Sequence, residues 1–123
     1  MTAVTDGLDM AAIGLLLRQR HAETTGQVGR LQAQAASMRG SHYAGSGDAA
    51  DAGTVALEAA EQTMVTMALQ EQLVRLQAAI DRLDSGTLGA CGRCGEQVPL
   101  TRLQVMPWAT HCVPCQSIVD RHR

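Results

Sequence analysis

Four cysteines in two pairs constrain this chain more than any other feature. They are the only cysteines in the chain, they follow the spacing C-x2-C-x17-C-x2-C, and they are Cys91, Cys94, Cys112 and Cys115. Two CxxC pairs separated by roughly 15–20 residues are typical of a tetrahedral zinc site. The spacing therefore predicts one zinc ion bound by four thiolates.

A zinc ion bound in this way is expected to be structural. Four thiolates leave no coordination position for water or substrate, so the metal stabilises the fold and takes no part in a reaction. A redox dithiol would need a CxxC that opens a helix in a βαβ context, and none surrounds Cys91. Disulfides would suit a secreted chain, but residues 1–14 lack the basic stretch of a signal peptide. His111 adjoins Cys112, yet four well-spaced cysteines leave no position for a histidine ligand.

A repeat of seven residues predicts a first long helix over residues 9–39. Its positions are Met10, Leu17, Thr24, Leu31 and Met38, with Val28 and Ala35 between them. The segment 40–47 is rich in glycine and serine and is expected to end this helix.

A second helix is expected from about residue 51 or 54 to residue 83, with Gly86 just beyond its end. Its apolar stripe consists of Val65, Leu69, Leu73, Leu76, Ile80 and Leu83.

The expected fold is therefore mostly α. A long antiparallel helical hairpin (a coiled coil), residues 1–86 with its tip at about 40–53, is followed by a four-cysteine zinc-finger module with a short C-terminal helix, residues 87–123. No stretch approaches the ~20 apolar residues of a membrane span, so we expect a cytoplasmic protein with no membrane partner.

Acidic residues gather in the middle of the chain. Residues 40–74 contain five acidic residues and no basic one, whereas residues 75–123 contain six arginines and four acidic residues. A DNA-binding protein needs a basic face, so sequence-specific DNA binding is not expected. This distribution suits a basic protein partner, or a metal-bearing active site reached by the acidic segment.

Two stretches carry a family resemblance. AIDRLDSGTLGACGRCGEQV (79–98) and RLQVMPWATHCVPCQ (102–116) resemble the zinc finger of the DksA/TraR family of bacterial transcription regulators, and the resemblance spans roughly residues 45–118. It implies a protein that binds RNA polymerase. In that family the coiled-coil tip enters the secondary channel of the polymerase and modulates initiation, often together with the nucleotide ppGpp.

The resemblance also assigns residues at the tip. The family motif D-x-x-D-x-A falls on Asp48, Asp51 and Gly53, with glycine in place of the alanine. Glycine loosens the first turn of a helix by up to ~1 kcal/mol relative to alanine. The alternative role of the two aspartates is to cap the second helix, where the helix dipole favours carboxylates.

Nucleotide binding is expected to be weak or absent. The family positions that contact ppGpp fall on Arg75, Met106 and Gln116, of which only Arg75 is basic, whereas a pyrophosphate site needs several clustered cations. Arg75 and Arg102 are nevertheless possible contacts to polymerase or nucleotide.

No catalytic constellation is found in the sequence, so we expect a protein that is not an enzyme. Two functions without a polymerase role compete with transcription regulation. One is a zinc-stapled scaffold, including an oligomeric coiled coil whose apolar seams pair between chains. The other is a redox- or zinc-responsive switch in which thiol oxidation releases the metal.

Overall fold

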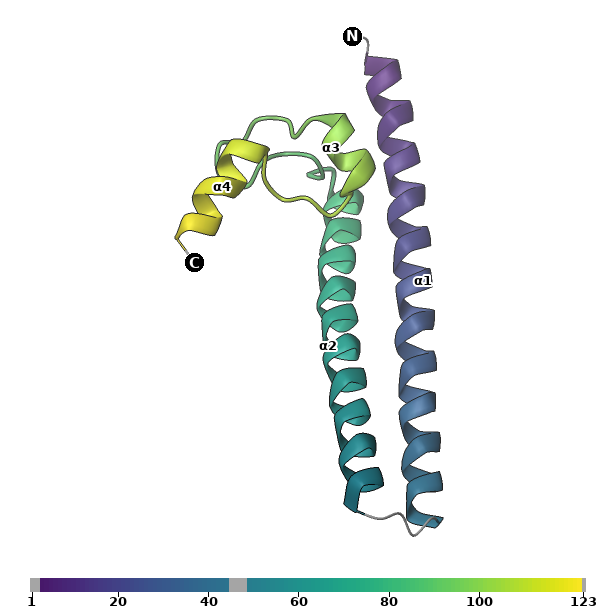
Figure 1. Cartoon of the computed structure of the whole chain (residues 1–123). Helices are drawn as coiled ribbons and strands as arrows, with labels where there is room; N and C mark the ends of the chain where they lie inside the picture. Colours follow the sequence, from purple (N-terminus) through teal and green to yellow (C-terminus); the bar gives the residue numbers. More distant parts are fainter. Residues whose placement is uncertain (1–2, 45–48, 123) are drawn as a thin grey trace. The chain divides into compact units, whose positions relative to one another are not determined.

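The fold is mostly helical, as the sequence predicts. The computed structural model describes residues 3–44 and 49–122. In chain order the helices are α1 (Ala3–Ala44), α2 (Ala49–Ser85), α3 (Leu100–Val105) and α4 (Val113–Arg121) (Figure 1). Within the described residues, β structure amounts to one isolated antiparallel bridge between Ala90 and Gln97.

The chain divides into two compact units, which are described separately. The finger unit comprises Met1–His21 and Arg75–Arg123, and the hairpin unit comprises Ala22–Val74. Each unit therefore contains part of α1 and part of α2. The boundary expected at residue 86 stays a prediction.

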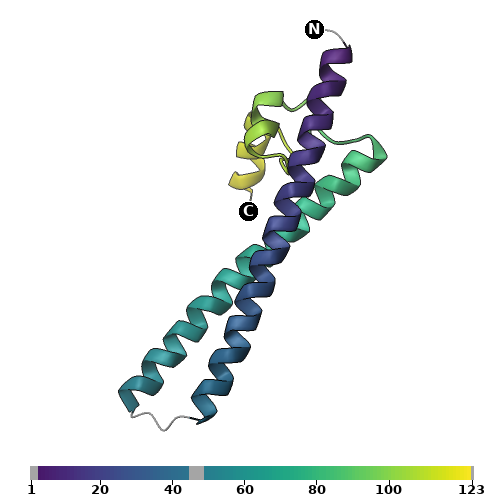
Figure 2. The same ribbon diagram turned by 90° about the vertical axis from the view of Figure 1, so that its right-hand side faces the viewer.

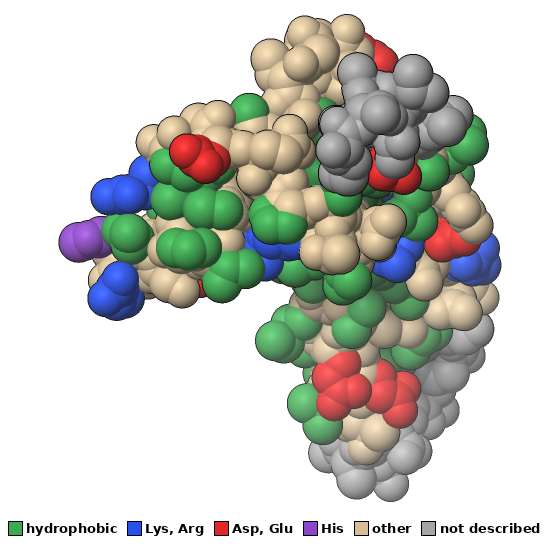
Figure 3. All heavy atoms as spheres, turned by 90° about the horizontal axis from the view of Figure 1, so that it is seen from above, with side chains coloured by type: hydrophobic (Ala, Val, Ile, Leu, Met, Phe, Trp, Pro, Cys, Tyr) green, Lys and Arg blue, Asp and Glu red, His purple; other side chains and the backbone are tan. Residues whose placement is uncertain are grey.

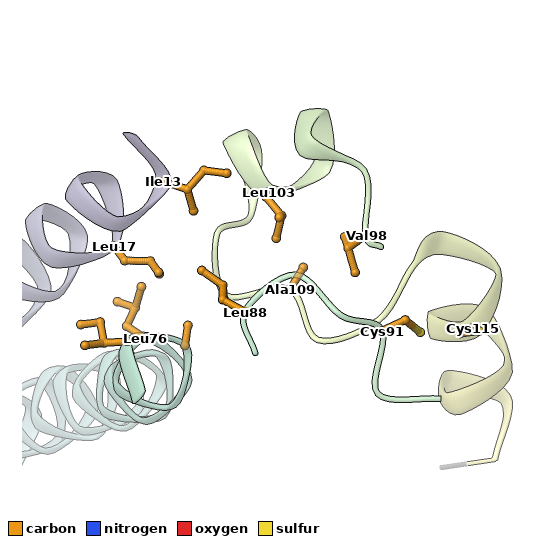
Figure 4. Close-up of a cluster of buried hydrophobic side chains, with 11 residues drawn as sticks. Ile13, Leu17, Leu76, Leu88, Cys91, Val98, Leu103, Ala109 and Cys115 are labelled. Carbon is orange, nitrogen blue, oxygen red and sulfur yellow. The ribbon is translucent and has the colours of Figure 1, made fainter. Parts of the chain in front are cut away.

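The finger unit has one apolar core that joins the helices to the zinc-finger loops (Figure 4). Leu17 of α1, Leu76 of α2 and Leu103 of α3 are almost completely buried, and Val98 and Ala109 from the loops complete the same cluster. Trp108 is half-buried and packs against this cluster. Because these buried side chains come from α1, α2, α3 and the loops on either side of α3, the core ties the ends of the two long helices to the finger.

The C-terminal end of α2 closes as the sequence predicts. Gly86 has a φ of 78°, a left-handed conformation that glycine adopts without strain. The N–H of Gly86 donates to the carbonyl of Leu83 at 3.1 Å, and the N–H of Thr87 donates to the carbonyl of Arg82 at 2.8 Å. These two bonds form a Schellman motif with Gly86 at the C′ position. The motif ends α2 and turns the chain into the first cysteine loop.

The hairpin unit consists of two helical segments that lie side by side, residues 22–44 of α1 and 49–74 of α2 (Figures 1 and 2). In this unit the seven-residue repeat of α1 is buried at Thr24 (8% exposed) and Val28 (7% exposed). Its later positions, Leu31, Ala35 and Met38, are half-buried. On α2, the inward positions in this unit are only half-buried, and they include Gln62 and Thr66. This unit therefore has a smaller and more polar core than the finger unit.

Three details of the hairpin differ from the sequence prediction. Val65 was expected on the inward stripe of α2 but is 51% exposed, because the stripe passes through Thr66 instead. Helix α1 continues to Ala44, and α2 begins at Ala49, so both extend towards the tip beyond their predicted ends. A single glycine such as Gly40 costs a helix only ~1 kcal/mol, which the helical hydrogen bonds of its neighbours offset.

None of the described helices is long and apolar enough to cross a membrane.

We predict that Leu76→Ala lowers the free energy of unfolding of the zinc-loaded protein by about 2–5 kcal/mol, because it leaves a cavity in the core of the finger unit. Leu15→Ala is the matched control, since Leu15 is 72% exposed and its truncation should change stability by less than ~0.5 kcal/mol. Urea unfolding followed by circular dichroism measures both. Equal losses in the two variants would contradict the assignment of this core.

Candidate functional site: a four-cysteine metal centre

The first cysteine pair lies in a tight turn that directly follows the end of α2. The N–H of Gly95 donates to the carbonyl of Cys91 at 3.0 Å, and the N–H of Cys91 donates to the carbonyl of Glu96 at 2.8 Å. The bridge between Ala90 and Gln97 closes the base of this turn. These backbone bonds fix the turn that carries Cys91 and Cys94 independently of a metal ion.

The second cysteine pair opens α4. Cys112 is the N-cap residue of this helix, and Cys115 lies in its first turn. Pro114 occupies one of the first helical positions, where its missing N–H costs no hydrogen bond. The N–H of Gly92 donates to the carbonyl of Thr110 at 2.8 Å, so the two cysteine loops are joined by a backbone bond.

The glycines of the first turn have two different roles. Gly95 has a φ of 76°, which only glycine adopts readily. Gly92 has an ordinary φ, but a Cβ atom there would lie 3.3 Å from Nε2 of His111 and 3.5 Å from the carbonyl oxygen of Thr110. Gly95 therefore permits the left-handed backbone of this turn. At Gly92 the reason for glycine is the close approach of the second loop.

The four sulfur atoms converge on one point. The Sγ atoms of Cys91, Cys94, Cys112 and Cys115 all lie within 4.8 Å of one another. The Sγ atoms of Cys94 and Cys112 are 3.9 Å apart. A tetrahedron with zinc–sulfur bonds of about 2.3 Å has edges of about 3.8 Å. The site therefore fits one zinc ion, held by four thiolates in a closed coordination sphere.

The thiols of Cys91, Cys94 and Cys115 differ in their pKa values. Hydrogen bonds from backbone N–H groups, that of Cys94 above all, lower the pKa of Cys91 to about 5. The side chain of Cys112, and then burial, raise the pKa of Cys115 to about 12. At Cys94 a backbone hydrogen bond from Glu96 favours the thiolate, but the Cys91 side chain and burial outweigh it, so the pKa of Cys94 is raised. Zinc must therefore displace protons from at least two thiols.

Two arginines support the metal centre. Nη1 of Arg93 lies 4.0 Å from Sγ of Cys115, where its charge offsets the surplus negative charge of four thiolates around one Zn²⁺. Nε of Arg102 donates to the carbonyl of His111 at 3.1 Å and so fixes the loop that precedes Cys112. The sequence placed Arg102 among possible contacts to polymerase or nucleotide. Such a contact stays a prediction, beside the bracing role that the structure describes.

His111 is not part of the cysteine group. Its Nδ1 atom is hydrogen-bonded to the hydroxyl of Thr110 at 2.8 Å. That His111 does not replace a thiolate stays a prediction.

The predicted tip residues are described only in part. Asp48 lies outside the described residues, as does the side chain of Asp51, whose backbone belongs to α2. Gly53 is exposed in α2, and a Cβ atom there would meet nothing within 4 Å. Packing therefore does not demand a glycine at this position.

The predicted nucleotide positions do not form a basic cluster. Arg75 is exposed on α2, Met106 packs against the core, and the side-chain amide of Gln116 donates to Asp120 at 2.9 Å. On the face drawn in Figure 3, hydrophobic side chains gather on the finger, and arginine and histidine side chains lie at its edge. The prediction of weak or absent ppGpp binding stays a prediction.

Comparisons with known proteins bear on both the site and the fold. Residues 86–121 match the family model described as the prokaryotic dksA/traR C4-type zinc finger. An uncharacterized protein of Aquifex aeolicus is 39% identical over 49 residues, which are 40% of this chain and 34% of that protein. The RNA polymerase-binding transcription factor DksA of Haemophilus influenzae is 30% identical over 46 residues, or 37% of this chain and 32% of that protein. The matches thus span about a third of each relative's length.

A solved structure matches nearly the whole chain. The transcription factor DksA2 from Pseudomonas aeruginosa covers 95% of this chain and 87% of its own, with a TM-score of 0.82 and 20% sequence identity. At this identity the likeness concerns the fold alone.

We predict that the apparent zinc affinity rises steeply with pH. Cys94 and Cys115 keep their protons between about pH 6 and pH 8, so zinc binding releases at least two protons and the affinity should rise about 100-fold or more per pH unit. Cys91, with a pKa of about 5, adds little to this slope because it is already a thiolate in that range. Competition with a zinc chelator across this range measures the effect. A slope of less than tenfold per pH unit would contradict the raised pKa values.

Proposed function

We propose that this chain, which belongs to the DksA/TraR family of zinc-finger proteins, is a transcription regulator that binds RNA polymerase directly. In the finer form of the proposal, the tip of the hairpin enters the secondary channel of the polymerase and modulates initiation. The proposal rests on two findings taken together. Residues 86–121 match the dksA/traR zinc-finger model, and the DksA2 structure matches the fold of 95% of this chain.

The charges of the hairpin unit support a partner with a basic surface. Residues 49–74, the part of α2 in this unit, contain no arginine or lysine. Glu58, Glu61 and Glu71 are all exposed there. Their negative potential adds to that of Asp51 at the start of α2 and favours a partner with a basic surface.

The thin core of the hairpin unit suits the same role. Small and polar side chains line the contact between α1 and α2 towards the tip, among them Ala35, Ala59 and Thr63. They leave a shallow groove of about 310 Å³ between the two helices. A helical pair with small side chains is narrow, so it can reach a site that a broader domain cannot enter.

The proposed mechanism is binding and not catalysis. The zinc ion has a complete set of protein ligands, so it offers no position at which a substrate could react. We propose a cytoplasmic location, since that is where a polymerase partner would be met. We propose that this chain acts without tight ppGpp binding by the family's mode, since Met106 and Gln116 stand at two of the three positions concerned.

We predict that the double variant Asp48→Asn/Asp51→Asn loses most of the effect of the protein on transcription, by about tenfold or more, because a few residues carry most of the energy of such a contact. Glu96→Gln is the matched control, since it neutralises an exposed carboxylate of the finger unit, outside the hairpin unit. The measurement is in vitro transcription with purified polymerase, alongside co-purification of the protein with polymerase.

The outcomes separate the two levels of the proposal. If the double variant regulates like the wild type, the tip does not act as proposed. If the wild-type protein neither binds polymerase nor changes transcription, the polymerase function itself is wrong.

We predict that Gly53→Ala stabilises the start of α2 by about 0.5–1 kcal/mol, because alanine favours helix and its Cβ atom would meet nothing. Amide hydrogen exchange of residues 52–56 measures the local stability, and the same transcription assay measures activity. If fraying of the first turn of α2 limits the activity of the tip, activity in the transcription assay should rise together with protection from hydrogen exchange. Unchanged exchange would show that Gly53 does not weaken this turn.

A further inference from the structure

Helix α2 carries a second apolar stripe on the side that faces away from α1. In the hairpin unit, Leu57 is 62% exposed, Met64 71%, Met67 56% and Val74 70%. Ala60 is also exposed and lies between Leu57 and Met64. We call these residues, together with Glu71, the outer stripe.

The outer stripe has the spacing of a coiled coil. Its positions are 57, 60, 64, 67, 71 and 74, with steps that alternate between three and four residues, and only Glu71 is not apolar. At about 100° per residue its centre lies roughly 150° around the helix from the inward positions such as Val55, Gln62 and Leu69. Isolated exposed apolar side chains need no explanation, but a sustained 3.5-residue repeat is the pattern with which one helix packs against another.

We propose that the outer stripe binds a second copy of this chain, with the two α2 helices antiparallel. In the best register, residue numbers facing each other add up to 131. Met64 then packs on Met67 of the second copy, and Leu57 packs on Val74 of the second copy. Every apolar position of the stripe except Ala60 meets another apolar position, and the same contacts are repeated by the two-fold symmetry.

The position of Glu71 selects the antiparallel arrangement. In this register Glu71 faces Ala60 of the second copy, whose small side chain leaves room for the carboxylate to reach water. A parallel pair in register would instead place the two Glu71 carboxylates face to face in the seam, where like charges are destabilising.

Charge complementarity supports a second copy as the occupant. Glu61 and Arg75 occupy equivalent flanking positions, two heptads apart along the continuous helix α2. Because side chains tilt towards the N-terminus of their own helix, Glu61 of one antiparallel copy points towards Arg75 of the other. Symmetry makes two such pairs in each dimer.

The size of the stripe sets the strength of the association. It spans 18 residues, about 27 Å of helix, and a stable interface buries about 800 Å² on each partner. A single helix face of this length is smaller, so the dimer should be weak, with a Kd on the order of 100 μM. This inference does not depend on the proposed polymerase function.

The test is sedimentation equilibrium of the zinc-loaded full chain between about 5 μM and 1 mM. We expect the average mass to rise from 13.0 kDa towards twice that value. Met64→Glu/Met67→Glu should abolish the rise. Val65→Glu is the matched control, because Val65 is 51% exposed on α2 but lies outside the stripe, and it should leave the rise unchanged. Circular dichroism and zinc content verify folding of each variant.

Charge reversal tests the antiparallel register. Glu61→Arg and Arg75→Glu should each weaken the dimer roughly fivefold, since each removes two surface ion pairs and adds repulsion. The double variant should restore the wild-type Kd. A mass of 13.0 kDa throughout, an equal loss with Val65→Glu, or a double variant no better than the single ones would overturn the proposal.

Discussion

The convergence of four sulfur atoms on one point is the constraint on which the finger unit depends. The two cysteine pairs are separated by 17 residues. Few of these residues, among them Val98, Leu103 and Ala109, are buried in the core. Cys91 and Cys115 belong to that same core. Zinc binding and apolar packing therefore stabilise the same set of segments, and loss of the metal would leave buried thiols together with a core of few side chains.

The apolar content of the helical seam differs between the two units. In the finger unit, α1 and α2 contribute Ile13, Leu17, Leu76 and Ile80, all almost fully buried. In the hairpin unit, the corresponding positions include Thr24 and Gln62, and the alanines near the tip have little surface to bury. Since local stability follows buried apolar area, the hairpin unit should open more readily than the finger unit. A tip that adapts to a partner can use this difference.

Helix α2 has two faces with the same periodicity, of which one is buried and the other is exposed. The inward face is covered by α1, and the outer stripe is exposed in the single chain. A selection for solubility alone would place charged side chains along the outer stripe, where Glu71 is the one charged residue. The methionines of the outer stripe are flexible and suit contacts that must form and break, consistent with a weak pairing of two chains.

The zinc ligands, the helical hairpin and the end of α2 at Gly86 could all be predicted from the sequence, because each depends on local spacing. Two CxxC motifs specify their own turns, a seven-residue repeat specifies a seam, and a glycine after a helix specifies a left-handed cap. The features that only the tertiary structure decided depend on which helices and loops pack together. The sequence assigned Val65 to the wrong face, because Val65 and Thr66 differ by only about 100° around the helix and hydrophobicity favoured the valine. It also missed the reason for Gly92, the contact of Arg93 with Cys115 and the brace from Arg102 to His111. Each of these contacts joins residues at least nine positions apart, and no local sequence pattern predicts which loop will approach which.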